Sequence, residues 1–128
     1  MVKYQFRVDV QPRYLQEQSA PDQGLFVFAY KIRITNTGSV TAQLISRVWN
    51  VNDANGHTEK VKGLGVVGQQ PLLKPGDAFE YTSGTRLRTP TGTMHGSFFC
   101  VAEDGERFEV PVALFVLEAD TPGARVLH

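Results

Sequence analysis

The sequence predicts an all-β domain: an antiparallel, immunoglobulin- or fibronectin-III-like β-sandwich of about seven strands. Apolar residues alternate with polar ones in several segments, which is typical of strands that bury one face. Clusters of glycine, proline and asparagine separate these segments at short intervals. No window of helical length carries apolar residues at i, i+3 and i+4. A closed barrel is the alternative architecture.

The first two strands are expected at residues 3–10 and 25–35, where every second side chain is apolar. Residues 11–20, between them, come nearest to a helical pattern. Pro12 and the polar residues that follow it weaken that interpretation. We therefore expect an irregular connection between these two strands.

The later strands are rich in β-branched and aromatic residues, and most are followed by a turn signal. They are expected at residues 40–51, 78–82, 97–103 and 108–116. Asn55-Gly56 and Asp104-Gly105 are typical of tight hairpin turns, because residues of these types tolerate positive φ. Pro111 removes a backbone donor from the last strand, so this strand is expected at a sheet edge or with a bulge.

Length and charge favour one domain without a broad charged surface. The 128 residues suit a single domain, 1–128, that buries a core without metal or disulfide support. Lysine and arginine balance aspartate and glutamate at 13 each, so there is no strong nucleic-acid signal. The single cysteine, Cys100, lies in an apolar run and is expected to be a buried small hydrophobe.

Neither end carries a targeting or membrane signal. The N-terminus lacks the apolar core of a signal peptide, and no apolar window is long enough to span a bilayer. We therefore expect a cytoplasmic protein that is complete from Met1 and does not insert into membranes. From about residue 118 the sequence predicts a loose tail.

Residues 62–68, KGLGVVG, match the G-x-G-x-x-G pattern of dinucleotide-binding folds. That chemistry needs a strand before the glycines, a helix after them and an acidic residue roughly 20 positions later. Pro75 and Gly76 allow one helical turn at most. Arg88 stands where the acidic residue would be needed. The context therefore argues against a dinucleotide site.

Two interpretations of this glycine-rich loop stay open. In the first, its glycines permit a sharply turned crossing between the two sheets, with Val66 and Val67 packed on the core. In the second, its backbone amides form a nest that binds an anion, a nucleotide or a partner weakly. The candidate residues for such binding are Lys62, Gly63, Gly65, Gly68 and Gln70.

A metal site has only weak candidates, Asp53, His57 and Glu59, which surround the predicted hairpin turn. Polar residues at a hairpin tip normally serve solvation. Val51 occupies the first ligand position of the calcium-loop pattern, which the turn otherwise resembles in part. We therefore expect no firm metal site and no cofactor. No triad or carboxylate pair stands out, so we expect no catalytic residues and no enzyme.

A candidate partner surface combines two pairs of residues. Arg47 and Trp49 alternate on a predicted strand, so they share a face that could bind an acidic or aromatic group. Burial of Trp49 in the core is the favoured alternative. Arg86 and Arg88 lie in residues 83–96, which are expected to form a long loop of the kind that often binds ligands.

Taken together, these motifs resemble the ApaG family. The matching residues include Arg47-Val48-Trp49, Asp53-Ala54-Asn55-Gly56, the block from Gly63 to Leu72, Tyr81-Thr82-Ser83-Gly84 and Thr89 to Gly96. The resemblance extends from about Tyr4 to His128. The glycine block with its following Q-x-P is far more specific than the bare three-glycine pattern.

This resemblance implies a sandwich fold and an association with cobalt resistance and magnesium efflux in bacteria. Related domains in eukaryotic F-box proteins and in a DNA-polymerase-interacting protein suggest protein–protein binding. A chain without a membrane span cannot itself conduct ions, so its link to these cations would be indirect. The expected function is therefore a non-catalytic, cytoplasmic protein-interaction module with an unknown protein partner. The alternative is a nucleotide or polyphosphate sensor that uses residues 62–70.

Overall fold

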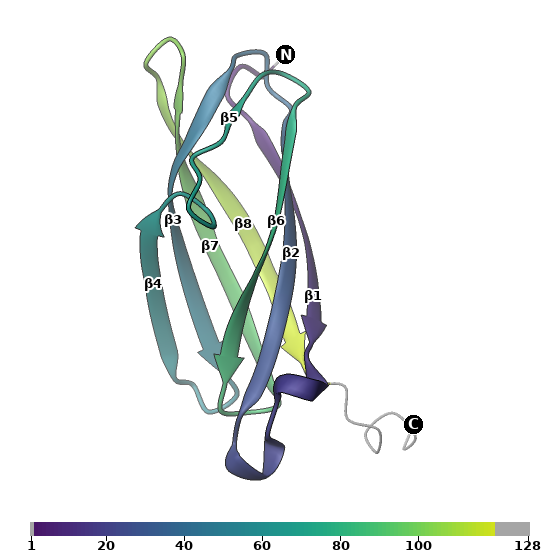
Figure 1. The fold of residues 1–128 in the computed structure, drawn as a ribbon. Helices are drawn as coiled ribbons and strands as arrows, with labels where there is room; N and C mark the ends of the chain where they lie inside the picture. Colours follow the sequence, from purple (N-terminus) through teal and green to yellow (C-terminus); the bar gives the residue numbers. More distant parts are fainter. Residues whose placement is uncertain (1, 120–128) are drawn as a thin grey trace.

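Two antiparallel sheets pack face to face in the computed structural model, which describes residues 2–119 (Figure 1). The first sheet has the order β1-β2-β6, with β1 at Phe6–Tyr14, β2 at Phe26–Asn36 and β6 at Ala78–Leu87. The second has the order β4-β3-β7-β8, with β3 at Ala42–Asp53, β4 at Thr58–Leu64, β7 at Thr91–Ala102 and β8 at Arg107–Glu118. Strand β5, Leu72–Leu73, also pairs with β3. The predicted antiparallel β-sandwich is confirmed.

The core lies between the sheets and follows the predicted alternation. On β2, every second side chain faces the other sheet, and Phe28, Ile32 and Ile34 are almost completely buried. Cys100 on β7 is fully buried, as predicted. The connection from β1 to β2 contains two short 3₁₀ turns, Gln16–Gln18 and Pro21–Gln23, in place of a helix.

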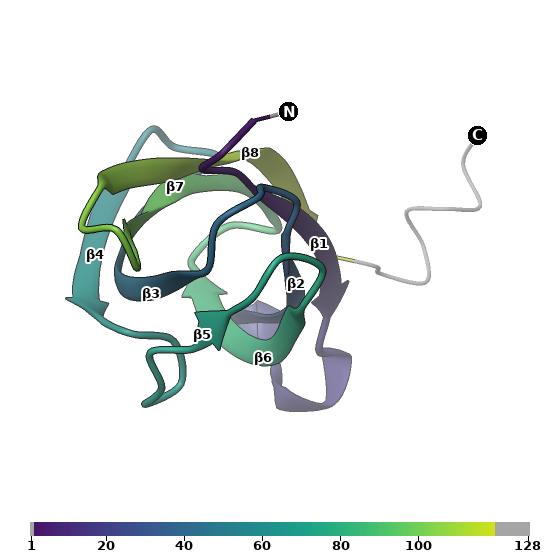
Figure 2. The same ribbon diagram turned by 90° about the horizontal axis from the view of Figure 1, so that it is seen from above.

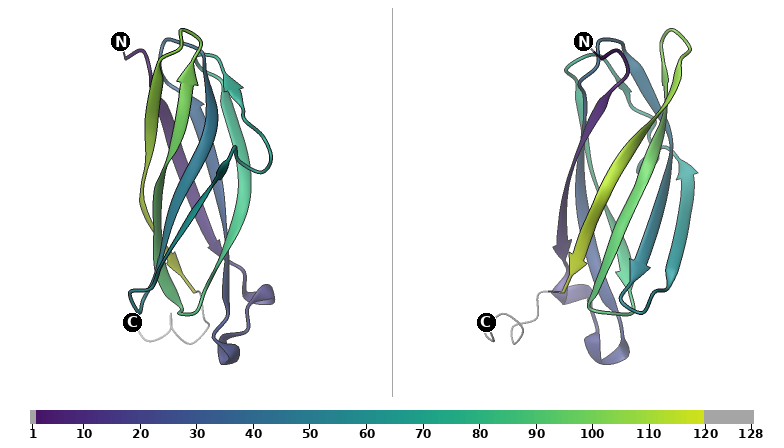
Figure 3. Two further views of the ribbon diagram at one scale, coloured as in Figure 1. Left: turned by 90° about the vertical axis from the view of Figure 1, so that its left-hand side faces the viewer. Right: turned by 180° about the vertical axis from the view of Figure 1, so that it is seen from behind.

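The two long sides of the sandwich differ. On one side β1 and β8 run next to each other (Figure 3, right), and the rings of Phe6 and Phe108 meet edge to face at 5.8 Å. Pro111 lies on β8, which is an edge strand as predicted. On the other side, the connection from β4 to β5 lies between β4 and β6 when the molecule is viewed along its length (Figure 2). This connection is the glycine-rich segment.

A β-bulge in β3 changes which side chains face the core. The register with β7 shifts between Leu44 and Ser46. Before the bulge, Leu44 is buried; after it, Trp49 and Val51 are buried. An extra residue in one strand reverses the alternation beyond it. The bulge therefore turns Arg47 toward the inner face of its sheet, at the side where the glycine-rich segment lies.

Two expectations about connections need correction. Residues 83–96 do not form a long loop, because β6 extends to Leu87 and β7 begins at Thr91. The glycine-rich segment does not cross between sheets, since β4 and β5 both pair with β3. The crossing to β6 follows at residues 74–77.

The chain is part of the second sheet almost to the end of the described residues. Strand β8 continues to Glu118, and Ala119 is buried and donates its N–H to the carbonyl oxygen of Pro90 at 2.8 Å. The rest of the predicted tail lies outside the described residues.

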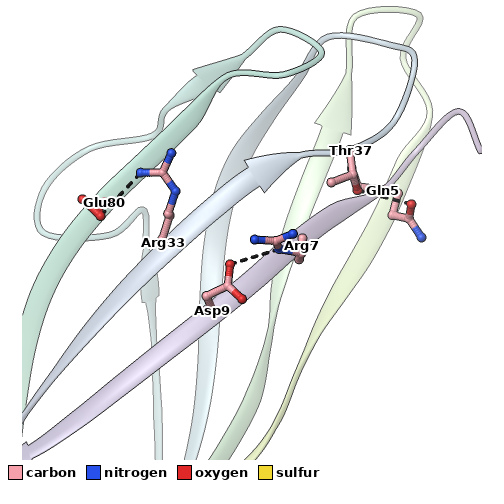
Figure 4. A network of polar contacts seen from close by, with 6 residues as sticks. All are labelled: Gln5, Arg7, Asp9, Arg33, Thr37 and Glu80. Carbon is pink, nitrogen blue, oxygen red and sulfur yellow. Dashed lines mark hydrogen bonds and ion pairs between the residues drawn. The ribbon is translucent and has the colours of Figure 1, made fainter.

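The outer face of the first sheet is covered by charges that pair with one another (Figure 4). Arg7 lies 3.1 Å from Asp9, and Arg33 lies 3.5 Å from Glu80, in exposed ion pairs. Lys31 also reaches Glu80, at 3.6 Å. Such pairs contribute little stability. Three cations face two carboxylates in these pairs, and the exposed Arg13 and Arg86 share the same face, so the face carries an excess of positive charge.

Candidate functional site

The connection between β4 and β5 is a tight turn on a rigid base. Val66 and Gln69 form an isolated β-bridge, and each donates its N–H to the carbonyl oxygen of the other, at 2.8 and 2.9 Å. The two residues between them have positive φ, 44° at Val67 and 80° at Gly68. Positive φ at both central positions is the geometry of a type I′ turn. A β-branched residue is rare there, so Val67 is strained.

Hydrogen bonds fix the connection to β3. The N–H of Gly65 and the side-chain amide of Gln70 both donate to the carbonyl oxygen of Ile45, at 2.8 and 3.0 Å. The side-chain amide of Gln43 donates to the carbonyl oxygen of Gln70 at 3.0 Å. The connection therefore fills the gap on the edge of β3 that β4 and β5 leave between them.

Arg47 joins this connection to the inner side of the sheet. Its Nη1 atom donates to the carbonyl oxygens of Leu64 and Gly65, at 3.1 and 2.9 Å. The guanidinium lies directly on Gly63, since a Cβ atom there would be 2.7 Å from Nη1. Gly63 therefore makes room for the arginine. None of the other residues between 2 and 119 accepts a hydrogen bond from Nε or Nη2 of Arg47.

A pocket of about 230 Å³ opens beneath the connection. Its lining comes from both sheets and consists of Tyr30, Arg47, Trp49, Leu64, Val66, Val67, Gly68, Tyr81 and Ser83. Val66 is fully buried and anchors the turn on the core, as predicted. Val67 is not packed on the core, because it is 54% exposed at the tip of the turn.

Trp49 forms the inner wall of this pocket and is not a surface residue. It is 3% exposed, and its ring meets Tyr30 at 5.7 Å and Phe98 at 5.9 Å. Its prediction as part of an exposed partner surface is therefore wrong, and the alternative of a core tryptophan holds. A large ring on the inner face of a central strand buries most readily between the sheets.

Tyr81 and Ser83 are pocket residues that the sequence did not single out. Tyr81 is 7% exposed, and its hydroxyl finds no hydrogen-bond partner among residues 2–119. Burial raises the pKa of Tyr81; the nearby Tyr30 adds to this, and Arg47 opposes it. The hydroxyl is therefore a neutral donor close to a guanidinium. The shared parity of residues 81 and 83 on one strand is the sequence signal that could have identified them.

Large apolar side chains stand exposed along the same connection. Leu64 precedes it and is 76% exposed, Val67 is at its tip, and Leu72 follows it with 61% exposed. We call these three residues the apolar rim. Leu64 and Val67 also line the pocket. A rigid turn thus presents apolar groups beside a polar cavity.

The predicted anion-binding residues are brought together only in part. Gly63, Gly65 and Gln70 surround Arg47 and the edge of β3, and Gly68 lines the pocket. The amides of Gly65, Val66 and Gln69 donate within the protein. Lys62 is exposed and alternates with the inward-packed Val61, so it faces away from the pocket.

The remaining predicted residues lie elsewhere. Arg86 and Arg88 are exposed at the far end of β6, and neither lines the pocket that contains Arg47. Asp53 shapes the hairpin turn, because its Oδ1 atom accepts the N–H groups of Asn55 and His57, at 2.9 and 3.0 Å. Within residues 2–119 no three histidine, cysteine or acidic side chains are placed to hold a metal ion.

Two further observations limit the chemistry of the described chain. Burial raises the pKa of Cys100 to about 12, so this thiol is a poor nucleophile. No helix in the part of the chain that the structure describes is long and apolar enough to cross a membrane.

Comparison with known proteins identifies the family. The family model of the ApaG domain matches residues 16–102. A protein named ApaG from Acidovorax sp. (strain JS42) is 70% identical, and one from Ralstonia nicotianae is 56% identical; each match covers 100% of both chains. A crystal structure from Bordetella pertussis has a TM-score of 0.91 and 57% identity, and covers 92% of this chain and 96% of that one. The chain therefore belongs to the ApaG family.

Proposed function

We propose that this protein is a non-catalytic protein-interaction module that docks a partner on the connection between β4 and β5. The observation that carries the proposal is the apolar rim: Leu64, Val67 and Leu72 are exposed within nine residues, at the tip and on both sides of one rigid turn. Exposed apolar groups that gather in this way mark interaction sites more often than scattered ones do. The expected partner surface is apolar at its centre.

The backbone of the turn supports this role. Hydrogen bonds from Gly65, Gln70 and Arg47 hold the turn before any partner arrives. A preformed surface loses little conformational entropy on binding. The backbone strain at Val67 also supports a docking role, because strained backbone tends to persist at functional positions.

The non-catalytic part of the proposal is supported by how candidate groups are used. The Asp53 carboxylate accepts hydrogen bonds from the backbone of the hairpin turn, and the Cys100 thiol is buried with a raised pKa. The cytoplasmic location and the indirect link to cobalt and magnesium stay predictions from the sequence and the family resemblance. A nucleotide sensor on residues 62–70 receives less support, because the amides of Gly65, Val66 and Gln69 already have acceptors.

Site-specific photo-cross-linking in the native host tests the proposal. A photoreactive amino acid at position 67 should give one reproducible adduct with a protein partner. The same amino acid at position 116, an equally exposed apolar position on β8, is the matched control and should not give this adduct. Added wild-type protein should compete for the adduct, and a Leu64→Ser/Val67→Asn variant should not. Equal adducts at both positions would reject this docking surface.

A further inference from the structure

The pocket beneath the β4–β5 connection carries charge of one sign among the described residues. Arg47 supplies a positively charged guanidinium, and the other lining residues whose side chains can donate hydrogen bonds are Tyr30, Trp49, Tyr81 and Ser83. None of the described residues that line the pocket is acidic. A guanidinium beside several hydrogen-bond donors, with no acidic side chain to pair with it, is the complement of an oxyanion.

The hydroxyl of Tyr81 is the group that the fold alone does not explain. It is buried, and no atom of residues 2–119 bonds to it. A buried hydroxyl without a partner is unfavourable, because it has lost its hydrogen bonds to water. An acceptor that enters the pocket would remove this cost, and the free N–H groups of Arg47 would bind the same acceptor.

We infer that this pocket binds the carboxylate of an acidic side chain that the docking partner proposed above inserts beneath the β4–β5 connection. This inference rests on the proposed function and names the chemistry that the partner must present. The apolar rim would contact the partner's apolar surface, while the pocket would receive one glutamate-like side chain. The bulge in β3, which turns Arg47 inward, is what equips the pocket with its charge.

Charge and shape favour a carboxylate over a phosphate. Among the described residues, Arg47 is the only cation that lines the pocket, so a single negative charge is balanced and a second one is not. The walls from Trp49 and Val66 are apolar and suit a short aliphatic stem. The volume of about 230 Å³ is smaller than most small-molecule sites, but it accommodates one side chain.

Trp49 provides the readout, since it is the only tryptophan and it lines the pocket. Its fluorescence is titrated with butyrate, which mimics a glutamate side chain, at constant ionic strength. Butyramide, which has the same shape without the charge, and inorganic phosphate are titrated in parallel. Butyrate should change the fluorescence in a saturable way at millimolar concentration, and neither of the other compounds should do so in that range.

Two hydroxyl deletions separate binding from folding. Tyr81→Phe should weaken butyrate binding about tenfold, because a hydrogen bond to a charged group is lost. It should leave the melting temperature unchanged or higher, since the hydroxyl has no hydrogen-bond partner among residues 2–119. Tyr14→Phe is the matched control, because Tyr14 carries a second buried, unpartnered hydroxyl outside this pocket. It should leave butyrate binding unchanged.

The outcomes distinguish the two proposals. Butyrate binding that Tyr81→Phe weakens and Tyr14→Phe does not would support the carboxylate pocket. No saturable change with butyrate, an equal response to butyramide, or tighter binding of phosphate would overturn it. None of these results depends on the cross-link at position 67. A failed butyrate titration would therefore reject the carboxylate pocket and leave the docking surface in place. A failed cross-link would reject the docking surface and leave carboxylate binding in place.

Discussion

Val67 combines backbone strain with exposure, and this combination makes it the most informative single residue of the docking surface. Its φ of 44° belongs to the left-handed region, where a β-branched side chain is unfavourable. More than half of its side chain is nevertheless exposed, so no packing in the described protein compensates fully for the strain. A residue that costs stability without filling the core is consistent with the docking role proposed above.

Substitution of Val67 should therefore separate stability from function. Val67→Asn creates an Asn-Gly pair, the preferred sequence for a type I′ turn. We expect the free energy of unfolding in urea to rise by about 1 kcal/mol. The same protein should lose its ability to compete for the partner adduct. Val116→Asn makes the same chemical change on an extended strand and should lower stability slightly. A loss of stability in Val67→Asn would contradict the strain argument.

At the scale of elements, two register shifts in the second sheet determine which of its side chains line the pocket. The bulge between Leu44 and Ser46 turns Arg47 inward, and a second register shift follows Met94 on β7. Next to this second shift, Gly96 pairs with Trp49, and the backbone of β3 packs directly against Gly96. An added Cβ atom at Gly96 would collide with the carbonyl oxygen of Val48. The position of Trp49 in the pocket wall thus depends on a glycine in the neighbouring strand.

Gly96→Ala should therefore be severely destabilising. The collision is with backbone, which cannot move without disturbing the ladder between β3 and β7. We expect a loss of about 3 kcal/mol or more in the free energy of unfolding, measured in urea. Gly84→Ala on β6 is the matched control, because its nearest atom would be a carbonyl oxygen of Phe28 at 3.2 Å. The control should cost less than about 1 kcal/mol. Equal losses would show that the close approach at Gly96 is not what matters.

For the whole molecule, periodicity was enough to predict the sandwich, and residue type predicted the turns at Asn55-Gly56 and Asp104-Gly105 and the edge position of Pro111. Periodicity could not predict the pocket. Alternation placed Arg47 on the same face as Trp49, and burial of that face was the favoured interpretation, but the inserted residue in β3 that reverses the alternation leaves no signal in the sequence. The pocket also unites side chains from β2, β3 and β6, which only the packing of the two sheets brings together.

The stability of the whole fold should fall in alkali because of Cys100. Burial raises its pKa from the usual 9.0 to about 12, so between these values the folded protein holds a proton that the unfolded chain releases. Stability from this group is therefore complete below pH 9 and is lost as the pH rises toward 12. At pH 10 the loss should be about 1.4 kcal/mol relative to pH 8. Urea unfolding of wild type and Cys100→Ala at both pH values measures it.

The comparison between the two proteins isolates the thiol from other titrating groups. Cys100→Ala should be less stable at pH 8, because it leaves a cavity in the core, but its stability should fall less between pH 8 and pH 10. Parallel pH profiles for the two proteins would contradict the assignment to Cys100.

Arg47, turned inward by the bulge, is proposed to offer the free N–H groups of its guanidinium to a carboxylate beneath the β4–β5 connection. The Nε–H resonances of the arginines, followed by ¹H–¹⁵N NMR during a titration with butyrate, test this directly. The Arg47 resonance should move in a saturable way, while those of Arg86 and Arg88 should stay in place. Similar shifts for all three arginines, or no shift at Arg47, would contradict it.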